Sequence, residues 1–210
     1  MRRTAAQTRE HVLDVAHELF YWQGIRSVGV DRIASEAGVA PTTLYRVFAS
    51  KDDLVEAYVE RAAQRYRTWF DAAVSAGGDD PRDRVLSVFD ALPEQLRPEI
   101  CHGCPFMMAL GEFPEPSRGA HRQAAELKQW VHGRFLDLSR ALPVADPDLV
   151  ADQLFLALEG SYATVQALGT DGPARRARTI AELVLAQTPG KPVTSPVGGG
   201  RRRTPGTGPD

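Results

Sequence analysis

The chain has 210 residues, 43% of them hydrophobic, which is enough to bury a sizeable core in one large or two small domains. No run approaches the about eighteen apolar residues that a membrane span needs, and the N-terminus lacks a signal-peptide pattern. We therefore expect a cytoplasmic protein without a membrane partner. Only two cysteines occur, which argues against a disulfide scaffold.

Charge is distributed unevenly along the chain, although the formal net charge is only -2. Residues 1–51 carry seven basic and five acidic side chains, whereas residues 52–187 carry fourteen basic and twenty-one acidic ones. Residues 188–210 carry four basic side chains and one acidic side chain. A mildly basic N-terminal segment on an acidic body is expected of a small DNA-binding domain joined to a regulatory domain.

The first predicted helix runs from about Gln7 to Trp22, because apolar residues recur there at three- and four-residue spacing and Gly24 follows as a stop. Arg9 lies near its start. It is either a phosphate contact or part of a solvated helix face, and the sequence leaves both interpretations open.

Residues 29–51 read GVDRIASEAGVAPTTLYRVFASK and contain two short helical patterns. Gly38 separates them, because glycine turns sharply at little steric cost, and Pro41 suits the first position of the second helix. In that second helix Leu44 and Phe48 lie four residues apart and point inward together. A helix, a glycine turn and a helix with a polar outer face make a helix-turn-helix, whose second helix fits the DNA major groove.

The spacing GV-x-x-x-T-L-Y-x-x-F, followed by a lysine, resembles the tetracycline-repressor (TetR/AcrR) family of transcriptional regulators. The resemblance is strong over residues 8–54 and is architectural beyond them. It implies that outward side chains of the second helix read DNA and that the lysine clamps a phosphate. The implied DNA-binding residues are Thr42, Thr43, Tyr45, Arg46 and Lys51. The alternative is a solvent-exposed helix that contacts nothing.

This sequence departs from the family pattern at the starts of both short helices. Val28 and Gly29 stand where the first helix usually begins with a serine or threonine, and Ala40 replaces the usual polar cap of the second helix. Neither change threatens the fold, but both remove a hydroxyl that could contact a phosphate.

The rest of the chain reads as helical, without an alternating strand pattern, so we predict an all-α fold. A long helix opens at Ser50 and ends at residues 77–81, and further helices follow at about 82–96, 104–113, 121–142, 147–168 and 173–187. We predict a helix-turn-helix domain over residues 1–50 and a helical effector-binding and dimerisation domain over residues 51–187. Residues 188–210 are rich in Pro, Gly, Thr and Arg, which predicts a disordered tail.

The two cysteines form the sequence Cys101-His102-Gly103-Cys104, which could bind metal or act as a redox pair. A structural zinc site needs four ligands, and no second pair exists, so no metal is expected. The simpler interpretation is that both thiols are small core groups. The alternative is a thiol-based redox regulator that acts through Cys101 and Cys104.

The resemblance implies that helices of the second domain surround a pocket for a small, largely apolar effector. The predicted ligand-binding residues are Phe106, Met107, Leu110, Phe113, Trp130, Phe155 and Tyr162. It also implies a homodimer formed through the last two helices, where small residues recur. Those small residues are Ala151, Ala157, Gly160, Ala163, Ala167, Ala174, Ala177 and Ala181.

Together these features predict a homodimeric transcriptional repressor that binds a palindromic double-stranded operator and is released from it by a small molecule. No cofactor is expected. A helical enzyme without DNA binding is a remote alternative, because the sequence offers no acid/base pair, phosphate loop or metal-spacing motif.

Overall fold

The computed structural model describes residues 3–186, and within this range the chain forms helices and no strand, as predicted. In chain order the elements are α1 Ala5–Gln23, α2 Val30–Glu36, α3 Pro41–Val47, α4 Lys51–Ala76, α5 Pro81–Gln95, α6 Pro105–Glu112, α7 Gly119–Arg140, α8 Pro147–Leu168, the 3-10 turn η1 Pro173–Arg176, and α9 Ala177–Leu185. The predicted tail at residues 188–210 lies outside the described residues.

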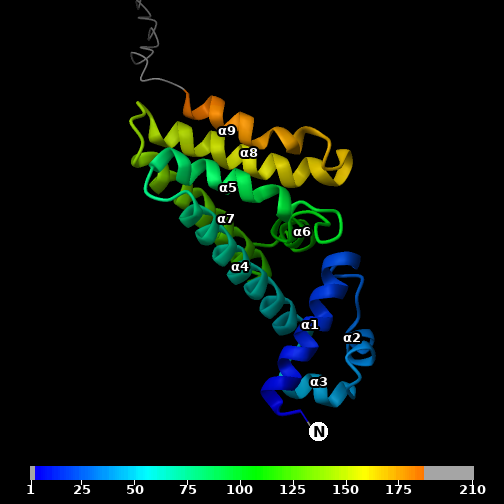
Figure 1. Ribbon diagram of the computed structural model, residues 1–210. Helices are drawn as coiled ribbons and strands as arrows, with labels where there is room; N and C mark the ends of the chain where they lie inside the picture. Colours follow the sequence, from blue (N-terminus) through cyan, green and yellow to red (C-terminus); the bar gives the residue numbers. More distant parts are fainter. Residues whose placement is uncertain (1–2, 187–210) are drawn as a thin grey trace, which may run out of the picture.

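The first three helices form a small head at one end of the molecule (Figure 1). α1 begins two residues before the predicted Gln7, because Thr4 and Gln7 form a capping box in which each side chain accepts from the other's backbone N–H. Gly24 ends α1 with φ of 87°, a conformation that suits glycine. The buried side chains Phe20 and Leu44 belong to the core of this head.

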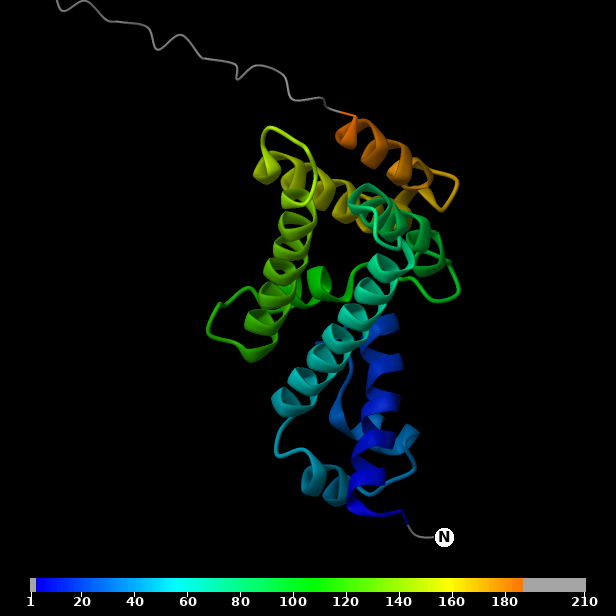
Figure 2. The same cartoon turned by 60° about the vertical axis from the view of Figure 1, so that its left-hand side comes forward.

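Helix α4 connects the head to the body. Ser50 caps it by accepting a 3.0 Å hydrogen bond from the backbone N–H of Asp53. The N-terminal half of α4 runs beside α1 (Figure 2), and Tyr58 lies edge-on against the ring of Phe20 at 5.6 Å. Further along α4, Phe70 packs edge-on against Phe135 of α7 at 5.4 Å. A single rigid helix therefore has one end in each part of the molecule.

In the body α5 and α7 pack against α4, and α8 and α9 lie side by side at the end farthest from the head (Figure 1). Asp146 caps α8 by accepting from the N–H of Leu149, and Gly169 ends it, as the sequence predicted. The short α6 lies between the body and the head. Buried residues from α1 to α9 form one continuous core, so the head and the body share apolar surface.

The prediction of one helix over residues 173–187 was wrong at its start. Pro173–Arg176 form a 3-10 turn, and the α-helix begins only at Ala177. Tightened turns of this kind are frequent at helix N-termini. Gln187, the predicted last residue of this helix, lies outside the described residues.

Candidate DNA interface and effector cavity

The turn of the helix-turn-helix depends on Gly38, whose φ is 63°. Its N–H donates to the carbonyl of Ser35 at 3.0 Å, and the N–H of Val39 donates to the carbonyl of Ala34 at 3.0 Å. A side chain at residue 38 would be strained in this left-handed conformation. The turn therefore fixes the angle between α2 and α3.

Recognition helix α3 keeps an apolar face inward and a polar face outward. Leu44 and Phe48 are 0% and 3% exposed, which confirms the predicted inward face. Tyr45 is 48% exposed, and Thr42 and Arg46 are also exposed, while Thr43 is half-buried. The outward residues therefore offer hydroxyl and guanidinium donors of the kind that phosphates and base edges accept.

Lys51 lies at the joint between head and body. Its Nζ donates to the carbonyl of Arg26 at 3.4 Å and lies 5.9 Å from the ring centroid of Phe20. Burial lowers the pKa of Lys51, while the carboxylates of Glu112 and Asp52 act in the opposite direction. Its contact with a DNA phosphate stays a prediction.

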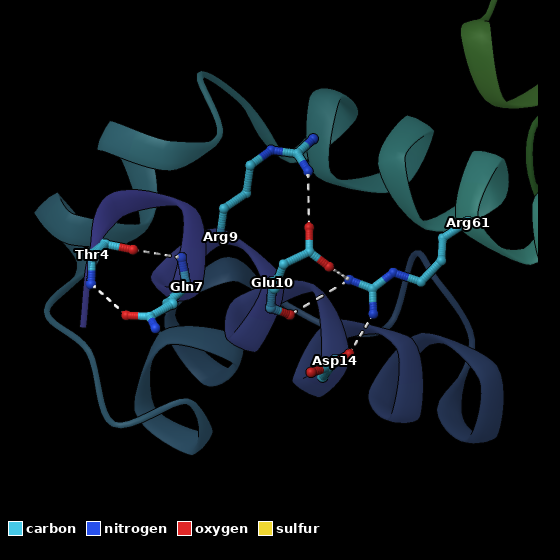
Figure 3. A network of polar contacts seen from close by, with 6 residues as sticks. All are labelled: Thr4, Gln7, Arg9, Glu10, Asp14 and Arg61. Atoms are coloured by element: carbon cyan, nitrogen blue, oxygen red, sulfur yellow. Dashed lines mark hydrogen bonds and ion pairs between the residues drawn. The ribbon is translucent and has the colours of Figure 1, made fainter.

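One polar network ties α1 to α4 (Figure 3). The guanidinium of Arg61 on α4 pairs with Glu10 at 3.0 Å and with Asp14, both on α1. Arg61 is only 15% exposed, whereas Glu10 and Asp14 are 63% and 61% exposed. Arg9 contributes an ion pair to Glu10 at 3.7 Å and lies 4.6 Å from the ring centroid of Phe48. Arg9 therefore contacts Phe48, the residue that caps the C-terminal end of α3.

A second joint runs from α6 to the loop that follows α1. The carboxylate of Glu112 accepts from the backbone N–H of Ile25 at 2.9 Å and from that of Arg26 at 2.6 Å. A third joint is the hydroxyl of Tyr21 on α1, which donates to the carbonyl of Gly103 and accepts from the N–H of His102, both at 2.8 Å. A movement of α6 would therefore shift the C-terminal end of α1.

A cavity of about 250 Å³ lies beside α1, and Tyr21 and Gly103 are among the residues that line it. Its walls come from α1, α4, the end of α5, α6, α8 and the segment between α5 and α6. The lining residues are His17, Tyr21, Ala62, Arg65, Tyr66, Trp69, Gln95, Ile100, Gly103, Pro105, Phe106 and Tyr162. A molecule bound here would contact the head and the body at once.

The structure brings only Phe106 and Tyr162 of the predicted ligand-binding residues to this cavity. Met107 is 54% exposed, and Leu110 is half-buried on the same helix. The other three lie elsewhere: Phe113 beside Arg26, Trp130 against Phe70, and Phe155 against His132. Sequence reasoning missed the polar members His17 and Arg65 together with Tyr66 and Trp69. Periodicity predicts helix faces but does not show which faces meet around a space.

Burial sets the protonation states around the cavity. It raises the pKa of the Tyr66 and Tyr162 phenols well above the ordinary value, and the centroids of the two rings lie 6.3 Å apart. Burial also lowers the pKa of His17, aided by the positive charge of Arg65. At neutral pH both phenols are therefore protonated and His17 is neutral.

Both cysteines are free thiols. Cys101 is half-buried and Cys104 is buried, with its Sγ 3.1 Å from the Nζ of Lys128. Lys128 also pairs with Glu159 at 2.6 Å, in an environment where both charged side chains are less than one-fifth exposed. Within residues 3–186 no three His, Cys, Asp or Glu side chains come together in a way that could hold a metal ion.

Two further hollows in the described part of the chain lack this aromatic wall. One of about 280 Å³ lies between α5 and α9, and one of about 510 Å³ extends from Trp22 to the end of α8. Among the helices that the structure describes, none has the length and apolar character required to cross a membrane.

Comparison with known proteins agrees with the geometry of the head. Residues 12–58 match the model of the family described as bacterial regulatory proteins, tetR family. The HTH-type transcriptional regulator YjdC of Escherichia coli K12 is 25% identical over 84% of this chain and 93% of its own length. The HTH-type transcriptional regulator SAB2452 of Staphylococcus aureus is 36% identical over 33% of this chain and 38% of its own length.

Solved structures extend the likeness to the body. SCO4454, a TetR-family transcriptional regulator from Streptomyces coelicolor, superposes with a TM-score of 0.78 at 28% identity over 86% of this chain and 95% of its own. Reduced NemR from E. coli has the same fold, with a TM-score of 0.74 at 20% identity over 84% of this chain and 95% of its own.

An exposed recognition helix held by a glycine turn on an all-helical body defines a helix-turn-helix DNA-binding transcriptional regulator. Residues 12–58 match the DNA-binding part of the TetR family, and the rest of the described chain is similar in fold to TetR-family regulators.

We predict that replacing Tyr45 or Arg46 with alanine weakens binding to specific DNA by about 1–3 kcal/mol and leaves the melting temperature unchanged. The reason is that both side chains are exposed beside the buried Leu44, so their removal costs contacts with DNA and no core. Fluorescence anisotropy with DNA fragments selected by the purified protein measures the effect.

Arg140→Ala is the matched control, because Arg140 is 60% exposed at the end of α7 and carries the same charge. Unchanged DNA affinity in both recognition-helix variants would contradict this assignment.

Proposed function

We propose that the protein is a homodimeric repressor that leaves its operator when a small molecule fills the cavity beside α1. One observation carries this proposal: the cavity wall includes His17 and Tyr21 of the head as well as side chains of α4, α6 and α8. A bound molecule can therefore change how the head sits on the body. Its place of action is the cytoplasm, where the operator DNA lies.

In this proposal the N-terminal and C-terminal helices have different functions. Residues 1–50 read DNA, with Thr42, Thr43, Tyr45 and Arg46 directed to the groove and Lys51 directed to a phosphate once DNA is bound. Residues 51–187 bind the effector and the second subunit. This is a division of function rather than of folding, because one apolar core runs from α1 to α9.

Dimerisation through α8 and α9 is supported by an apolar surface on these helices. Five of the nine large hydrophobic side chains that are exposed in the described chain lie there: Leu149, Leu156, Leu168, Ile180 and Leu183. In a monomer this apolar surface would be exposed to water. In a two-fold symmetric dimer the same surface of each subunit would be buried against the other subunit.

Only some of the small residues predicted at this interface are available to it. Gly160, Ala163 and Ala167 of α8 are exposed, so they suit close approach of a second subunit. Ala151, Ala174, Ala177 and Ala181 are buried within the chain instead. Their small size serves the contact of α8 with η1 and α9.

The switch follows from the spacing of two heads in the dimer. Both recognition helices must match half-sites about 34–36 Å apart, so a small tilt of each head changes the fit. A ligand shifts this equilibrium only by its differential affinity for the two arrangements. It must bind the DNA-free arrangement more tightly, and operator DNA must weaken its binding by the same factor.

The alternative of a thiol-based sensor has one structural observation in its favour. The Nζ of Lys128 donates to the Sγ of Cys104 at 3.1 Å, so this thiol has a charged side chain beside it. Against it, Cys104 is buried and Lys128 is already paired with Glu159. We therefore prefer the ligand switch to the redox switch, and a regulator to an enzyme.

The test of the proposal is a mobility-shift assay with DNA fragments that the purified protein selects from genomic DNA. A palindromic site bound by two subunits, and released on addition of a screened small molecule, is the expected result. Failure to select any DNA would contradict the proposed function.

We predict that Leu156→Glu and Leu183→Glu convert the dimer to a monomer and weaken operator binding. Leu156 and Leu183 are 67% and 66% exposed, so a lone chain tolerates the charge, whereas an interface would bury it at a cost of about 3–5 kcal/mol. Sedimentation velocity measures the change in mass. Met107→Glu, on a side chain that is 54% exposed on α6, is the control expected to remain dimeric.

For the cysteines, we predict that Cys101→Ser with Cys104→Ser leaves the response of the DNA complex to mild oxidant equal to that of wild type. The physical reason is that Cys104 is buried and a buried thiol is inert toward oxidants, so half-buried Cys101 has no reactive thiol partner at Cys104. A mobility shift with and without oxidant measures the response. Oxidant release of wild-type protein, beside a double variant that stays bound, would make the redox sensor the better account.

A further inference from the structure

The charge at the wall of the cavity beside α1 is positive. Of the side chains that line it, Arg65 alone carries a permanent charge, and no carboxylate is among them. The remaining polar groups at the lining are an imidazole, an amide and phenol hydroxyls. A cationic ligand would find no counter-charge here, whereas an anion would find a guanidinium.

Arg65 has no assigned role within the fold. It is exposed on α4 and forms neither an ion pair nor a side-chain hydrogen bond in the described part of the chain. One turn earlier on the same helix, Arg61 is held by Glu10 and Asp14. The guanidinium fork of Arg65 is therefore free for a carboxylate, which it can bind through two parallel hydrogen bonds.

His17 supplies a second group that awaits a partner. Its Nδ1 is buried and has no hydrogen-bond partner within residues 3–186, an arrangement that is unfavourable for the fold. Buried polar atoms in folded proteins are normally satisfied, so an orphan at a cavity wall points to a ligand atom. His17 and Arg65 face the same cavity, from α1 and α4 respectively.

The opposite part of the wall is aromatic. Tyr66 lies 5.1 Å from Trp69 and 5.9 Å from Phe106 by ring centroids, and 6.3 Å from Tyr162. All four of these side chains line the cavity, so their rings can contact a ligand. A volume of about 250 Å³ is slightly below the usual range for ligand sites, about 300–1,000 Å³, which favours a small molecule of one or two rings.

We propose that the effector is an aromatic carboxylic acid, whose carboxylate lies between the Arg65 guanidinium and the His17 imidazole and whose ring lies among Tyr66, Trp69 and Phe106. The assignment rests on the proposed function in taking this cavity as the effector site, and it replaces the expectation of a largely apolar effector.

The proposed carboxylate would bridge the same two helices that the Arg61 network joins. His17 follows Asp14 by three residues, and Arg65 follows Arg61 by four, so both pairs lie on matching helix faces one turn apart. An anion bound between His17 and Arg65 would add a second contact between α1 and α4, farther from the DNA than the Arg61 network. The head would then be held at the angle that suits the ligand.

Binding should depend on pH through His17. In the free protein Arg65 and Arg61 disfavour the imidazolium, Asp14 and Glu18 favour it, and the rings of Tyr21 and Tyr58 pack against it. The net pKa of His17 is below 6.5, and a carboxylate beside it would raise that pKa. Ligand affinity therefore increases as pH falls from above the pKa of His17 in the complex toward the lowered pKa of His17 in the free protein.

The experiment compares benzoate, phenylacetate and 2-naphthoate with their uncharged amides by isothermal titration calorimetry on the full chain. We expect at least one acid to bind about tenfold or more tightly than its amide, because the charge-assisted bonds are lost in the amide. Arg65→Gln and His17→Gln should each reduce that preference to about twofold or less, and His17→Gln should also remove the pH dependence.

Arg140→Gln is the charge-matched control, expected to keep the full preference, and circular dichroism confirms that each variant is folded. Equal affinity for acid and amide, acid preference that survives in Arg65→Gln, or no binding by any of the three acids would overturn the proposal. If the acids bind with the expected preference but leave the affinity for selected DNA unchanged, the proposed function fails and this site stands.

Discussion

The carboxylate of Glu112 is the contact on which the relation between head and body depends. It accepts from the backbone N–H groups of Ile25 and Arg26, in the loop that ends α1. Loss of this acceptor would leave the N–H of a buried residue unsatisfied, at a cost of about 1–3 kcal/mol. The ion pairs of Arg61 with two largely exposed carboxylates contribute less, about 0–1 kcal/mol each. α6 therefore holds the head more firmly than the more conspicuous charged network does.

The cavity lies where a ligand can act on these joints. Phe106 lines it from the first turn of α6, and Glu112 ends the same helix. His17 lines it from α1, whose far end carries the loop that Glu112 holds. A molecule that displaces Phe106 or draws His17 toward α4 must therefore either strain these hydrogen bonds or rotate the head with them.

The sequence predicted the parts of this structure that local chemistry determines. Gly38 needs a positive φ, Leu44 and Phe48 share a helix face, and Asp146 caps α8, and each of these signals depends on neighbouring residues alone. The cavity depends instead on five helices that are far apart in the chain and meet in space, so the family resemblance named Met107, which is exposed, and missed Arg65.

Reciprocal coupling between effector and operator tests the central claim most directly. The affinity of an effector identified by screening is measured for wild type and Glu112→Ala, with and without saturating operator DNA. The account predicts that operator weakens effector binding in wild type by the same factor by which effector weakens operator binding, and that Glu112→Ala loses most of this coupling while still binding each alone. Equal effector affinity with and without operator in the wild-type protein would contradict it.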